Sequence, residues 1–569
     1  MDKSTQYSSD DWQRNLVLTA RNTPVWLYQL SQKYGRDIQR LDQIPEEEIA
    51  LLAERGFTGL WLVGLWQRSS ASRKIKNLYG RPDAIASAYS IYAYRPADNL
   101  GGETALAELR RAASAHGIYL ACDMVPNHTG LDAPWLFEHP DRYISLPRSP
   151  LDEFAFNSPN LSDNPAGAIY LEEGYYNQTG AAEVFKYVPK NGPATFIYHG
   201  NDGTSMPWND TAQLNYLNPD TRQAVLREIL KVAREFHIIR LDAAMTLVRE
   251  HFKRLWFPSA GGDKFIPTRG MVTMTDAQFD RLMPREFWSE VVQAIQQEAP
   301  DTLLIAEAFW LMEKYFINEI GMHRVYNSAF MHQLRDEENT NFRSYLKEIL
   351  QTNPAMLERF VNFLTTPDEQ PAVLQFGKQQ KYLGACRLLA CMPGLPLFGH
   401  GQWEGLREHY GMDISRPTQI EQADPNLIDL HNRHIAPLLR QRPRFSSSDR
   451  FCLYEFLNGE RGDVDENVIA FSTCSGEQTA LILFNNCAAP IRGRLHHTVQ
   501  QICDPQDKDI HSQPVYLALR CPHGNAAQLT LRDLTQETEV TFDLEEIRSQ
   551  GLTFDLGPYE SHVFDVAWG

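Results

Sequence analysis

The sequence lacks an excess of basic residues. It contains 54 Lys and Arg against 72 Asp and Glu, so the formal net charge of the 569-residue chain is −18 at pH 7. Proteins that bind nucleic acid or anionic membranes present a basic surface, and this balance argues against both classes of partner. A neutral small molecule or a polysaccharide is a better match to such a composition.

Long apolar runs are also lacking. The most apolar late stretch, LLACMPGLPLFG, is short and interrupted by Pro and Gly, which excludes a membrane span there. The first residues, MDKSTQYSSDDWQRN, show no basic segment followed by an apolar run, so no secretory signal is expected and we predict a cytoplasmic protein. The eight cysteines form no CxxC pair and are expected to be buried, reduced thiols.

What the sequence does contain is an alternation of short apolar or β-branched runs with longer amphipathic segments, the pattern of a parallel α/β fold. Helical patterns such as 44–56 and 104–117 end on a Gly, which suits a left-handed helix end. The number of strands predicts a closed (β/α)8 TIM barrel rather than an open sheet. The eight predicted strands begin at Pro24, Phe57, Ile118, His237, Thr302, Arg324, Phe360 and Leu395.

Two segments interrupt or follow this pattern. Residues 129–213, rich in Tyr, Phe, Asn, Gly and Pro, are predicted to form a subdomain (domain B) inserted after the third strand, where insertions build active-site walls. Most aromatic residues of this insertion are expected to form its own small core. Residues 441–569 alternate polar and apolar positions and are predicted to form a C-terminal antiparallel β-sandwich (domain C). The barrel (domain A) then comprises residues 1–128 and 214–440.

Polar residues at the carboxyl ends of the predicted strands need an explanation, because the strands of a parallel barrel are expected to be apolar. In a barrel, these ends all lie at one rim, where active sites are built. Three carboxylates and an arginine at one rim indicate cleavage of a glycosidic bond through an oxocarbenium-like transition state. The polar positions are Asp123, Asn127 and His128 on the third strand, Arg240 and Asp242 on the fourth, Glu307 on the fifth and Asp368 after the seventh.

The environments of these carboxylates predict different roles. Arg240 lies two residues before Asp242, so the strand period places both side chains on one face. A nearby guanidinium holds a carboxylate ionised, which predicts Asp242 as the nucleophile. Glu307 would face other anions in an enclosed pocket, which raises its pKa and predicts a general acid.

The segments DMVPNHTG, IIRLDAAM, LLIAEAFW and FLTTPDEQ, in this order and spacing, resemble the four signature regions of the α-amylase family (glycoside hydrolase family 13). The resemblance covers nearly the whole chain, from the barrel through the insertion to the terminal sandwich. It implies a retaining enzyme in which Asp242 forms a covalent β-glycosyl intermediate and Glu307 is the acid/base. Asp368 would be the third carboxylate, which binds sugar hydroxyls.

The resemblance also implies residues that bind the substrate. His128 and Arg240 would hold the sugar in the cleaved subsite, and Tyr89 in SAYSIYAY resembles the stacking tyrosine of the family. Trp310, three residues after the acid, is predicted to lie in the wall of the cleft.

Two further groups of residues lie near the same rim. His400, Gln402 and Glu404, at the end of the eighth strand, are expected to shape the rim. Lys74, Lys76 and Arg81 are expected to form a solvated basic loop, with recognition of a phosphorylated sugar as the alternative.

The sequence departs from the family pattern in its fourth region, where Pro367 replaces the usual His before the Asp. One hydroxyl-binding donor is therefore missing. A similar Thr-Pro-Asp sequence is found in maltosyltransferases of the family, so the change does not imply an inactive enzyme. The fragment TAQLNY resembles the fifth region of the family but lacks the residues that would help to choose a subfamily.

No cofactor is predicted, and calcium remains an alternative. Asn127 matches a calcium ligand of secreted amylases, but the position that supplies a second ligand there, four residues after the nucleophile, is Thr246. A hard cation needs six or more oxygen ligands, and the sequence supports one.

The predicted function is therefore a retaining α-glycoside hydrolase that acts on α-1,4-glucans or malto-oligosaccharides. The alternative is an α-glucan transferase, of the 4-α-glucanotransferase or maltosyltransferase type, that uses the same intermediate but passes the glycosyl unit to an acceptor other than water. A third hypothesis, based on the missing His, is a non-catalytic amylase-like protein that binds carbohydrate.

Overall fold

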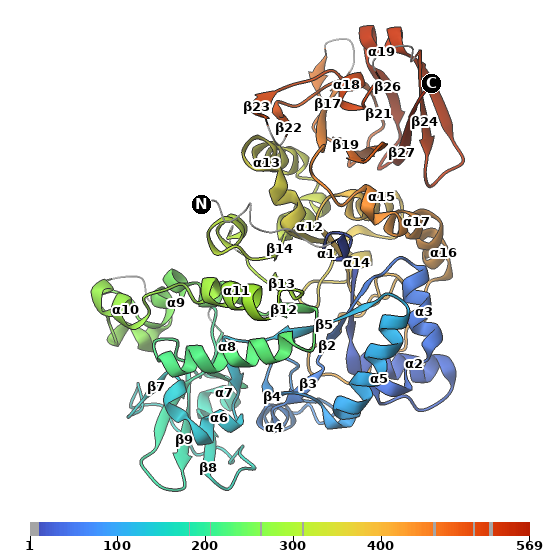
Figure 1. The fold of residues 1–569 in the computed structure, drawn as a ribbon. Coiled ribbons are helices and arrows are strands. Elements are labelled where there is room, and N and C mark those ends of the chain that lie inside the picture. The colour runs from blue at the N-terminus through green and yellow to red at the C-terminus, as the bar shows by residue number, and fades with distance from the viewer. Residues whose placement is uncertain are drawn as a thin grey trace.

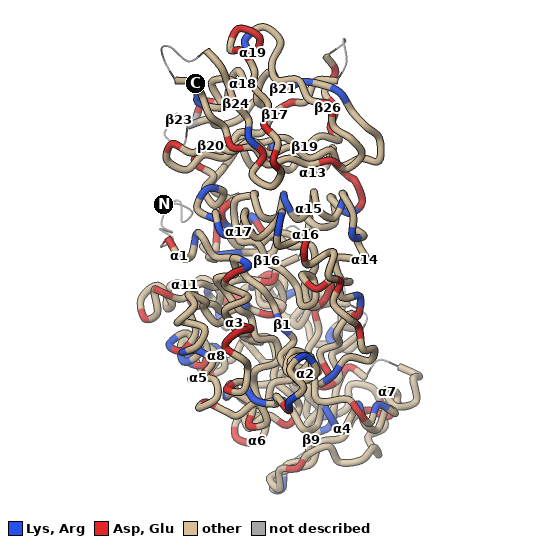
Figure 2. The backbone as a smooth tube through the Cα atoms, turned by 90° about the vertical axis from the view of Figure 1, so that its right-hand side faces the viewer, with Lys and Arg blue, Asp and Glu red and all other residues tan. Residues whose placement is uncertain are grey.

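The computed structural model describes residues 11–180, 182–204, 206–261, 265–309, 312–458, 462–504, 507–522 and 527–569. Among these residues, no helix has the length and apolar character that crossing a bilayer requires. Acidic and basic positions are scattered among one another along the chain in the view of Figure 2.

The centre of the molecule is a closed barrel of eight parallel strands (Figure 1), which confirms the predicted fold class. Its strands follow one another around the barrel in the order β1, β2, β5, β12, β13, β14, β15 and β16, and β16 pairs with β1 to close it. Their interiors are buried on both faces, as the apolar runs predict. The bounds are β1 Leu18–Asn22, β2 Gly59–Val63, β5 Tyr119–Met124, β12 Ile238–Leu241, β13 Leu303–Ala306, β14 Arg324–Tyr326, β15 Phe360–Phe363 and β16 Leu395–Phe398.

Seven of the eight strands lie where the sequence predicts them, but the first prediction is wrong. The segment that begins at Pro24 is helix α2 (Thr23–Tyr34), and the first strand is the preceding Leu18–Asn22. The Asn22 side chain accepts a hydrogen bond from the Val25 N–H, Pro24 stands in the first helical turn, and Gly35 ends the helix at φ 61°. These are start and stop signals of a helix, and they outweigh the apolar run of WLYQL.

Helices surround the barrel between its strands. Helix α3 covers most of the first predicted helical segment and α5 most of the second. Outside the insertion and the C-terminal part, the described α-helices are α1 Asp11–Arg14, α2 Thr23–Tyr34, α3 Glu46–Glu54, α4 Ser70–Leu78, α5 Gly102–Ala115, α8 Pro219–Ala233, α9 Arg249–Trp256, α10 Asp276–Leu282, α11 Phe287–Glu298, α12 Ser328–Arg335, α13 Asn339–Thr352, α14 Ala372–Phe376, α15 Gln380–Cys391, α16 Pro425–His434 and α17 Ala436–Arg440. A two-stranded sheet, β3 (Trp66–Arg68) with β4 (Ile91–Pro96), follows β2.

The chain between β5 and β12 forms a separate small sheet at the lower left of Figure 1. Strands β7 (Ser145–Leu146), β10 (Thr195–Tyr198), β9 (Val184–Pro189) and β8 (Gly167–Leu171) pair in this order, together with the short helices α6 (Pro134–Glu138) and α7 (Glu173–Asn177). Strands β6 (His128–Gly130) and β11 (Thr211–Gln213) pair where the segment leaves and rejoins the barrel. Its aromatic residues do not form a separate core as predicted: Tyr187 and Tyr198 are buried in one apolar cluster with the barrel, and most of the others are partly buried against that cluster.

The C-terminal part is an antiparallel sandwich with its own core, placed at the top of Figure 1 beside α13 and α15. Its strands are β17 Cys452–Asn458, β18 Asp463–Val464, β19 Val468–Ser475, β20 Gln478–Asn485, β21 Ile491–Thr498, β22 Gln501–Asp504, β23 Asp507–His511, β24 Gln528–Asp533, β25 Glu539–Asp543, β26 Leu552–Leu556 and β27 Ser561–Trp568, with helices α18 Val515–Ala518 and α19 Leu544–Gln550. All eight cysteines are free thiols, but burial is complete only for Cys122, Cys386, Cys391 and Cys452; the other four are partly exposed.

Candidate active site

Arg240 lies at the centre of a cluster of carboxylates at the carboxyl ends of the barrel strands. It is the third residue of β12 and is 2% exposed. Its Nη1 donates to Oδ1 of Asp242 at 2.7 Å and to Oδ1 of Asp123 at 2.9 Å. Its Nη2 lies 2.6 Å from Oε1 of Glu307 and 3.7 Å from Oδ2 of Asp368. The structure therefore brings together the three carboxylates that the sequence singled out, around the predicted arginine.

The burial of these groups is unequal. The side chain of Asp242 is 12% exposed and that of Glu307 7%, whereas that of Asp368 is 53% exposed. Asp368 thus lies toward the open side of the cluster, and the other two carboxylates lie deeper in the barrel.

The backbone that follows Asp242 has an unusual conformation. Ala243 has φ 44° and ψ 41°, a left-handed geometry that a residue with a Cβ rarely adopts. This geometry directs the Ala243 N–H to Oε2 of Glu307, at 2.7 Å. Strain of this kind costs about 1–3 kcal/mol and persists where the surrounding structure requires it. Here it holds the Glu307 carboxylate beside Asp242.

Four carboxylates share one guanidinium, so the cluster cannot be fully ionised at low cost. Burial raises the pKa of Glu307 to about 7; Arg240 opposes this rise, and Asp368 and Asp123 add to it. Burial likewise raises the pKa of Asp242 to about 6, against the lowering effect of Arg240. The sequence predicts that the guanidinium keeps Asp242 ionised. The structure shows that the guanidinium does lower this pKa but that burial is the larger effect.

Tyr89 and His128 form one side of the cluster. The Tyr89 hydroxyl accepts a hydrogen bond from Arg240 Nη1 at 3.3 Å. His128 Nε2 lies 3.2 Å from the Tyr89 carbonyl oxygen, and its ring packs on that of Trp208 with centroids 5.1 Å apart. Burial lowers the pKa of His128 to about 4, so the ring is neutral at pH 7. Its role as a sugar ligand stays a prediction.

Three residues of the cluster are absent from the predicted set of catalytic and substrate-binding residues. Asp123 accepts hydrogen bonds from Arg240 and from Trp61 Nε1, the latter at 2.9 Å. The Tyr326 hydroxyl accepts from Arg240 Nε at 3.0 Å. Asp123 stood out as a polar strand end, but the barrel-facing Trp61 and Tyr326 have no signal that separates them from core aromatics. Trp310 lies outside the described residues.

A family model described as the catalytic domain of alpha amylase matches residues 46–411, more than half of the chain. The chain belongs to the alpha-amylase family. No match is found among curated proteins.

Solved alpha-amylase structures share this fold at low sequence identity. The alpha-amylase of Geobacillus thermoleovorans, solved with acarbose, is 14% identical, with TM-score 0.60 over 98% of this chain and 99% of that one. A noncanonic maltogenic alpha-amylase from Thermotoga neapolitana is 12% identical, with TM-score 0.59 over 97% and 98%. The debranching enzyme of Nostoc punctiforme is 14% identical, with TM-score 0.58 over 98% and 99%. At these identities the comparisons show a shared fold.

The calcium ligand of secreted amylases does not carry over to this member of the alpha-amylase family. Oδ1 and the carbonyl oxygen of Asn127 both accept hydrogen bonds from Gln213 Nε2 at 3.0 Å, and the Thr246 hydroxyl donates to the Ala243 carbonyl at 2.7 Å. Among the described residues, no group of three His, Cys, Asp or Glu side chains is arranged to hold a metal ion. The residues present do not fit calcium.

The other rim residues of this amylase-family chain have structural partners. The prediction of a basic loop is wrong for Lys74 and Lys76, which lie on helix α4. Lys74 pairs with Asp163, and Lys76 and Arg81 pair with Asp413, so carboxylates balance all three charges. Glu404 pairs with Arg21 and Arg55.

The fourth-region Pro367 has a partner that the sequence could not reveal. Its carbonyl oxygen lies 2.7 Å from Nε2 of His409, in the long loop after β16. The contact joins this loop to the segment that carries Asp368.

Proposed function

We propose that this protein is a retaining α-glycoside hydrolase that acts on α-1,4-glucans or malto-oligosaccharides, with Asp242 as nucleophile and Glu307 as acid/base. The observation that carries the proposal is the attachment of these two carboxylates to the two terminal nitrogens of one buried guanidinium. Such an arrangement keeps the carboxyl groups close together, as a double displacement needs. The acarbose complex of the Geobacillus enzyme supports an α-glucan as the substrate class.

The two steps follow from the positions of these groups. Arg240 binds Oδ1 of Asp242, and Oδ2 is assigned to attack the anomeric carbon while Glu307 gives its proton to the departing glycosidic oxygen. The bond from the anomeric carbon to that oxygen breaks as the bond to Asp242 forms. A water molecule then loses a proton to Glu307, and its oxygen displaces Asp242, which restores the α configuration.

Asp368, Tyr89, His128 and Arg240 are assigned to bind the sugar beside the nucleophile. The half-exposed carboxylate of Asp368 is suited to accept hydrogen bonds from sugar hydroxyls at the open side. The assignment of Tyr89 rests on its hydroxyl contact with Arg240, which fixes its ring beside the cluster.

Glycosyl transfer is the second candidate function, and Pro367 is the sequence feature that favours it. Both functions use the same covalent intermediate and differ in the acceptor that resolves it. A product time course on maltose, maltoheptaose and glycogen, with and without phosphate or an added sugar acceptor, separates them. Release of reducing sugar from maltoheptaose supports the hydrolase; disproportionation without net reducing-sugar release would replace it with the transferase.

The two carboxyl pKa values set an expected pH dependence. Asp242 must be ionised and Glu307 protonated, so kcat/KM is expected to rise with an apparent pKa near 6 and to fall with one near 7. An activated aryl maltoside has a leaving group that needs no proton. On this substrate, Glu307→Gln should still cleave the bond to the aryl group, and the fall in kcat/KM at high pH should disappear.

A matched control is Glu286→Gln. Burial also raises the pKa of Glu286, which caps α11 through the Trp288 N–H and lies outside the cluster. This variant should keep both the rise and the fall of kcat/KM with pH. If Glu307→Gln kept the fall at high pH, the assignment of Glu307 as the acid would be rejected.

A further inference from the structure

Residues 408–413, in the long loop after β16, form a rim bridge that crosses one side of the barrel rim beside the carboxylate cluster. Its first end lies on the side of Asp368. Nε2 of His409 is 2.7 Å from the carbonyl oxygen of Pro367, the residue directly before Asp368. This end of the rim bridge is therefore fixed to the segment that carries the third carboxylate.

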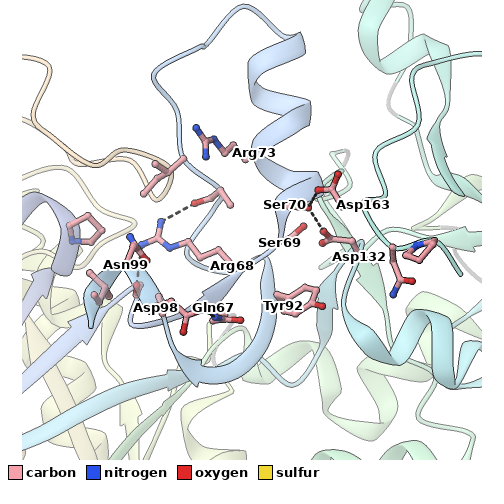
Figure 3. A pocket seen from close by; sticks show the side chains of 18 residues that line it. Gln67, Arg68, Ser69, Ser70, Arg73, Tyr92, Asp98, Asn99, Asp132 and Asp163 are labelled. Carbon is pink, nitrogen blue, oxygen red and sulfur yellow. Dashed lines mark hydrogen bonds between the residues drawn. The ribbon is translucent and has the colours of Figure 1, made fainter. Parts of the chain in front are cut away.

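The other end of the rim bridge is fixed to the segment that carries Tyr89. The carbonyl oxygen of Met412 accepts a hydrogen bond of 2.9 Å from the N–H of Ala88, the residue directly before Tyr89. Arg68, whose side chain is drawn in Figure 3, donates through Nη1 to the same carbonyl oxygen at 3.2 Å. The four residues 409–412 thus connect the two sides of the cluster, and their three Cα-to-Cα steps span at most about 11 Å.

Side-chain contacts hold the rim bridge in place. Tyr410 is 6% exposed, its hydroxyl accepts a hydrogen bond from Nε2 of Gln29 at 2.9 Å, and its ring packs on that of His400. Asp413 accepts two hydrogen bonds from Arg81, at 2.6 and 3.0 Å. A guanidinium that binds a carboxylate at two points fixes its geometry as well as its charge. The rim bridge is therefore built as a wall and not as a mobile lid.

A glucan chain has no room to pass beneath the rim bridge. The cavity between the bridge and the strand ends measures about 40 Å³. Asn22 and Val63, the last residues of β1 and β2, line it on the barrel side. Such a volume holds a few water molecules and lies far below the range of about 300–1,000 Å³ that is usual for small-molecule sites. The rim bridge therefore ends the cleft on this side.

The place of the rim bridge around the barrel shows which end of a bound glucan it faces. The bridge passes the end of β1, where Nδ2 of Asn22 donates to the Gly411 carbonyl at 3.3 Å. Glu307 follows β13, which is four strands from β1 in either direction and so lies on the opposite side of the rim. Glu307 is assigned to protonate the oxygen that leaves C1 of the sugar beside the nucleophile. Because C4 lies at the other end of the pyranose ring, the nonreducing part of the glucan points toward the rim bridge.

We propose that the rim bridge closes the nonreducing end of the cleft and makes this enzyme exo-acting, so that it removes glucose or maltose from the nonreducing end of an α-glucan. The proposal rests on the proposed function, because the direction of the glucan follows from the role assigned to Glu307. The released unit is short because the bridge contacts the residues directly before Asp368 and Tyr89, which are assigned to the sugar beside the nucleophile. A transferase that uses the same intermediate moves the same unit to its acceptor.

A substrate with a blocked nonreducing end tests this proposal. The native protein is given p-nitrophenyl α-maltoheptaoside in two forms, one free and one with a 4,6-O-ethylidene group on its nonreducing glucose, and the products are separated by chromatography. The nonreducing end must fit against the rim bridge, so the blocked form should be cleaved at least about 100-fold more slowly. The free form should release glucose or maltose from the first time point, and no longer sugar without the nitrophenyl group.

A variant of the rim bridge tests whether this segment is the wall. His409→Ala combined with Asp413→Ala removes side-chain contacts at both ends of the bridge, and this variant should cleave the blocked form at least about tenfold faster than the native chain does. Asp429→Ala is the matched control, because Asp429 is an exposed aspartate that pairs with Arg433 on the same helix, α16. The control should keep the native preference for the free form.

Three outcomes count against the proposal in different ways. Similar rates on the two forms, with shorter blocked fragments among the products, would overturn it and leave the catalytic assignment intact. An unchanged preference for the free form in the folded double variant would show that the rim bridge is not the wall. Cleavage of neither form would contradict the proposed function and, with it, the direction assigned to the glucan.

Discussion

Asp242→Ala is expected to lower kcat on maltoheptaose by roughly 10⁴- to 10⁶-fold, the loss seen when other covalent nucleophiles are removed. Asp242 lies against Arg240 at the end of β12, and no other carboxylate of the cluster is assigned to attack the anomeric carbon. The residual activity would come from binding and from Glu307. The measurement is a steady-state rate on maltoheptaose, with folding checked by thermal unfolding.

Rescue of activity by added azide distinguishes a catalytic nucleophile from a carboxylate that only balances the charge of Arg240. The shortened side chain of Asp242→Ala leaves room for azide to attack the anomeric carbon of an activated aryl α-maltoside. One displacement inverts the configuration, so a β-glycosyl azide is expected together with a rise in rate. Asp123→Asn is the matched control, because Asp123 also binds Arg240 Nη1 but is not assigned to the reaction. The mechanism would be rejected if azide raised the rate of neither variant and Asp242→Ala kept near-native activity.

The sequence predicts the carboxylate cluster because the geometry of a parallel barrel leaves little freedom. Once Arg240, Asp242 and Glu307 are assigned to the ends of neighbouring strands, closure of the barrel brings them to one rim. The first strand is misplaced because β1 carries the polar Arg21 and Asn22, whereas the following helix supplies the stronger apolar run.

The features that the sequence does not predict depend on contacts between distant segments. Pairing of His409 with Pro367 joins two loops of the rim, and packing of Trp208 on His128 joins the insertion to the barrel. The left-handed Ala243 donates its N–H to the Glu307 carboxylate, which follows the next strand of the barrel. Burial raises the pKa of Asp242 and the Arg240 guanidinium lowers it. The pattern of residues in a strand does not show which of these two effects is larger.

A second large effect is expected when the protein is acidified. Burial lowers the pKa of six histidines to about 3 or 4, well below the usual 6.5. They are His128, His199, His251, His323, His400 and His431. Folding requires their neutral form, so the unfolded chain binds more protons below pH 6.5. Stability is therefore complete above pH 6.5 and is lost as the pH falls toward 4.

The carboxylate cluster acts in the opposite direction, because raised pKa values favour the folded state as the pH falls. Burial raises the pKa of Asp123 and Asp242 to about 6 and that of Glu307 to about 7. Between pH 7 and pH 5, each of these three carboxyl groups adds about 1–2 kcal/mol of stability, and the pKa of Asp368 is raised as well. Each histidine removes about 2 kcal/mol over the same range. The six histidines outnumber the four carboxyl groups, so acidification causes a net loss of stability.

Urea unfolding at a series of pH values between 7.5 and 4.5 measures this balance. The free energy of unfolding is expected to change little near pH 7 and to fall steeply below pH 6. His431→Gln removes one buried histidine, whose ring nitrogens contact Tyr382 and Trp403, and should make the acid slope shallower by about one proton. His332→Gln, at a half-exposed position on α12, should leave the slope unchanged. A free energy of unfolding that stays constant down to pH 4.5 would show that the buried histidines do not control acid stability.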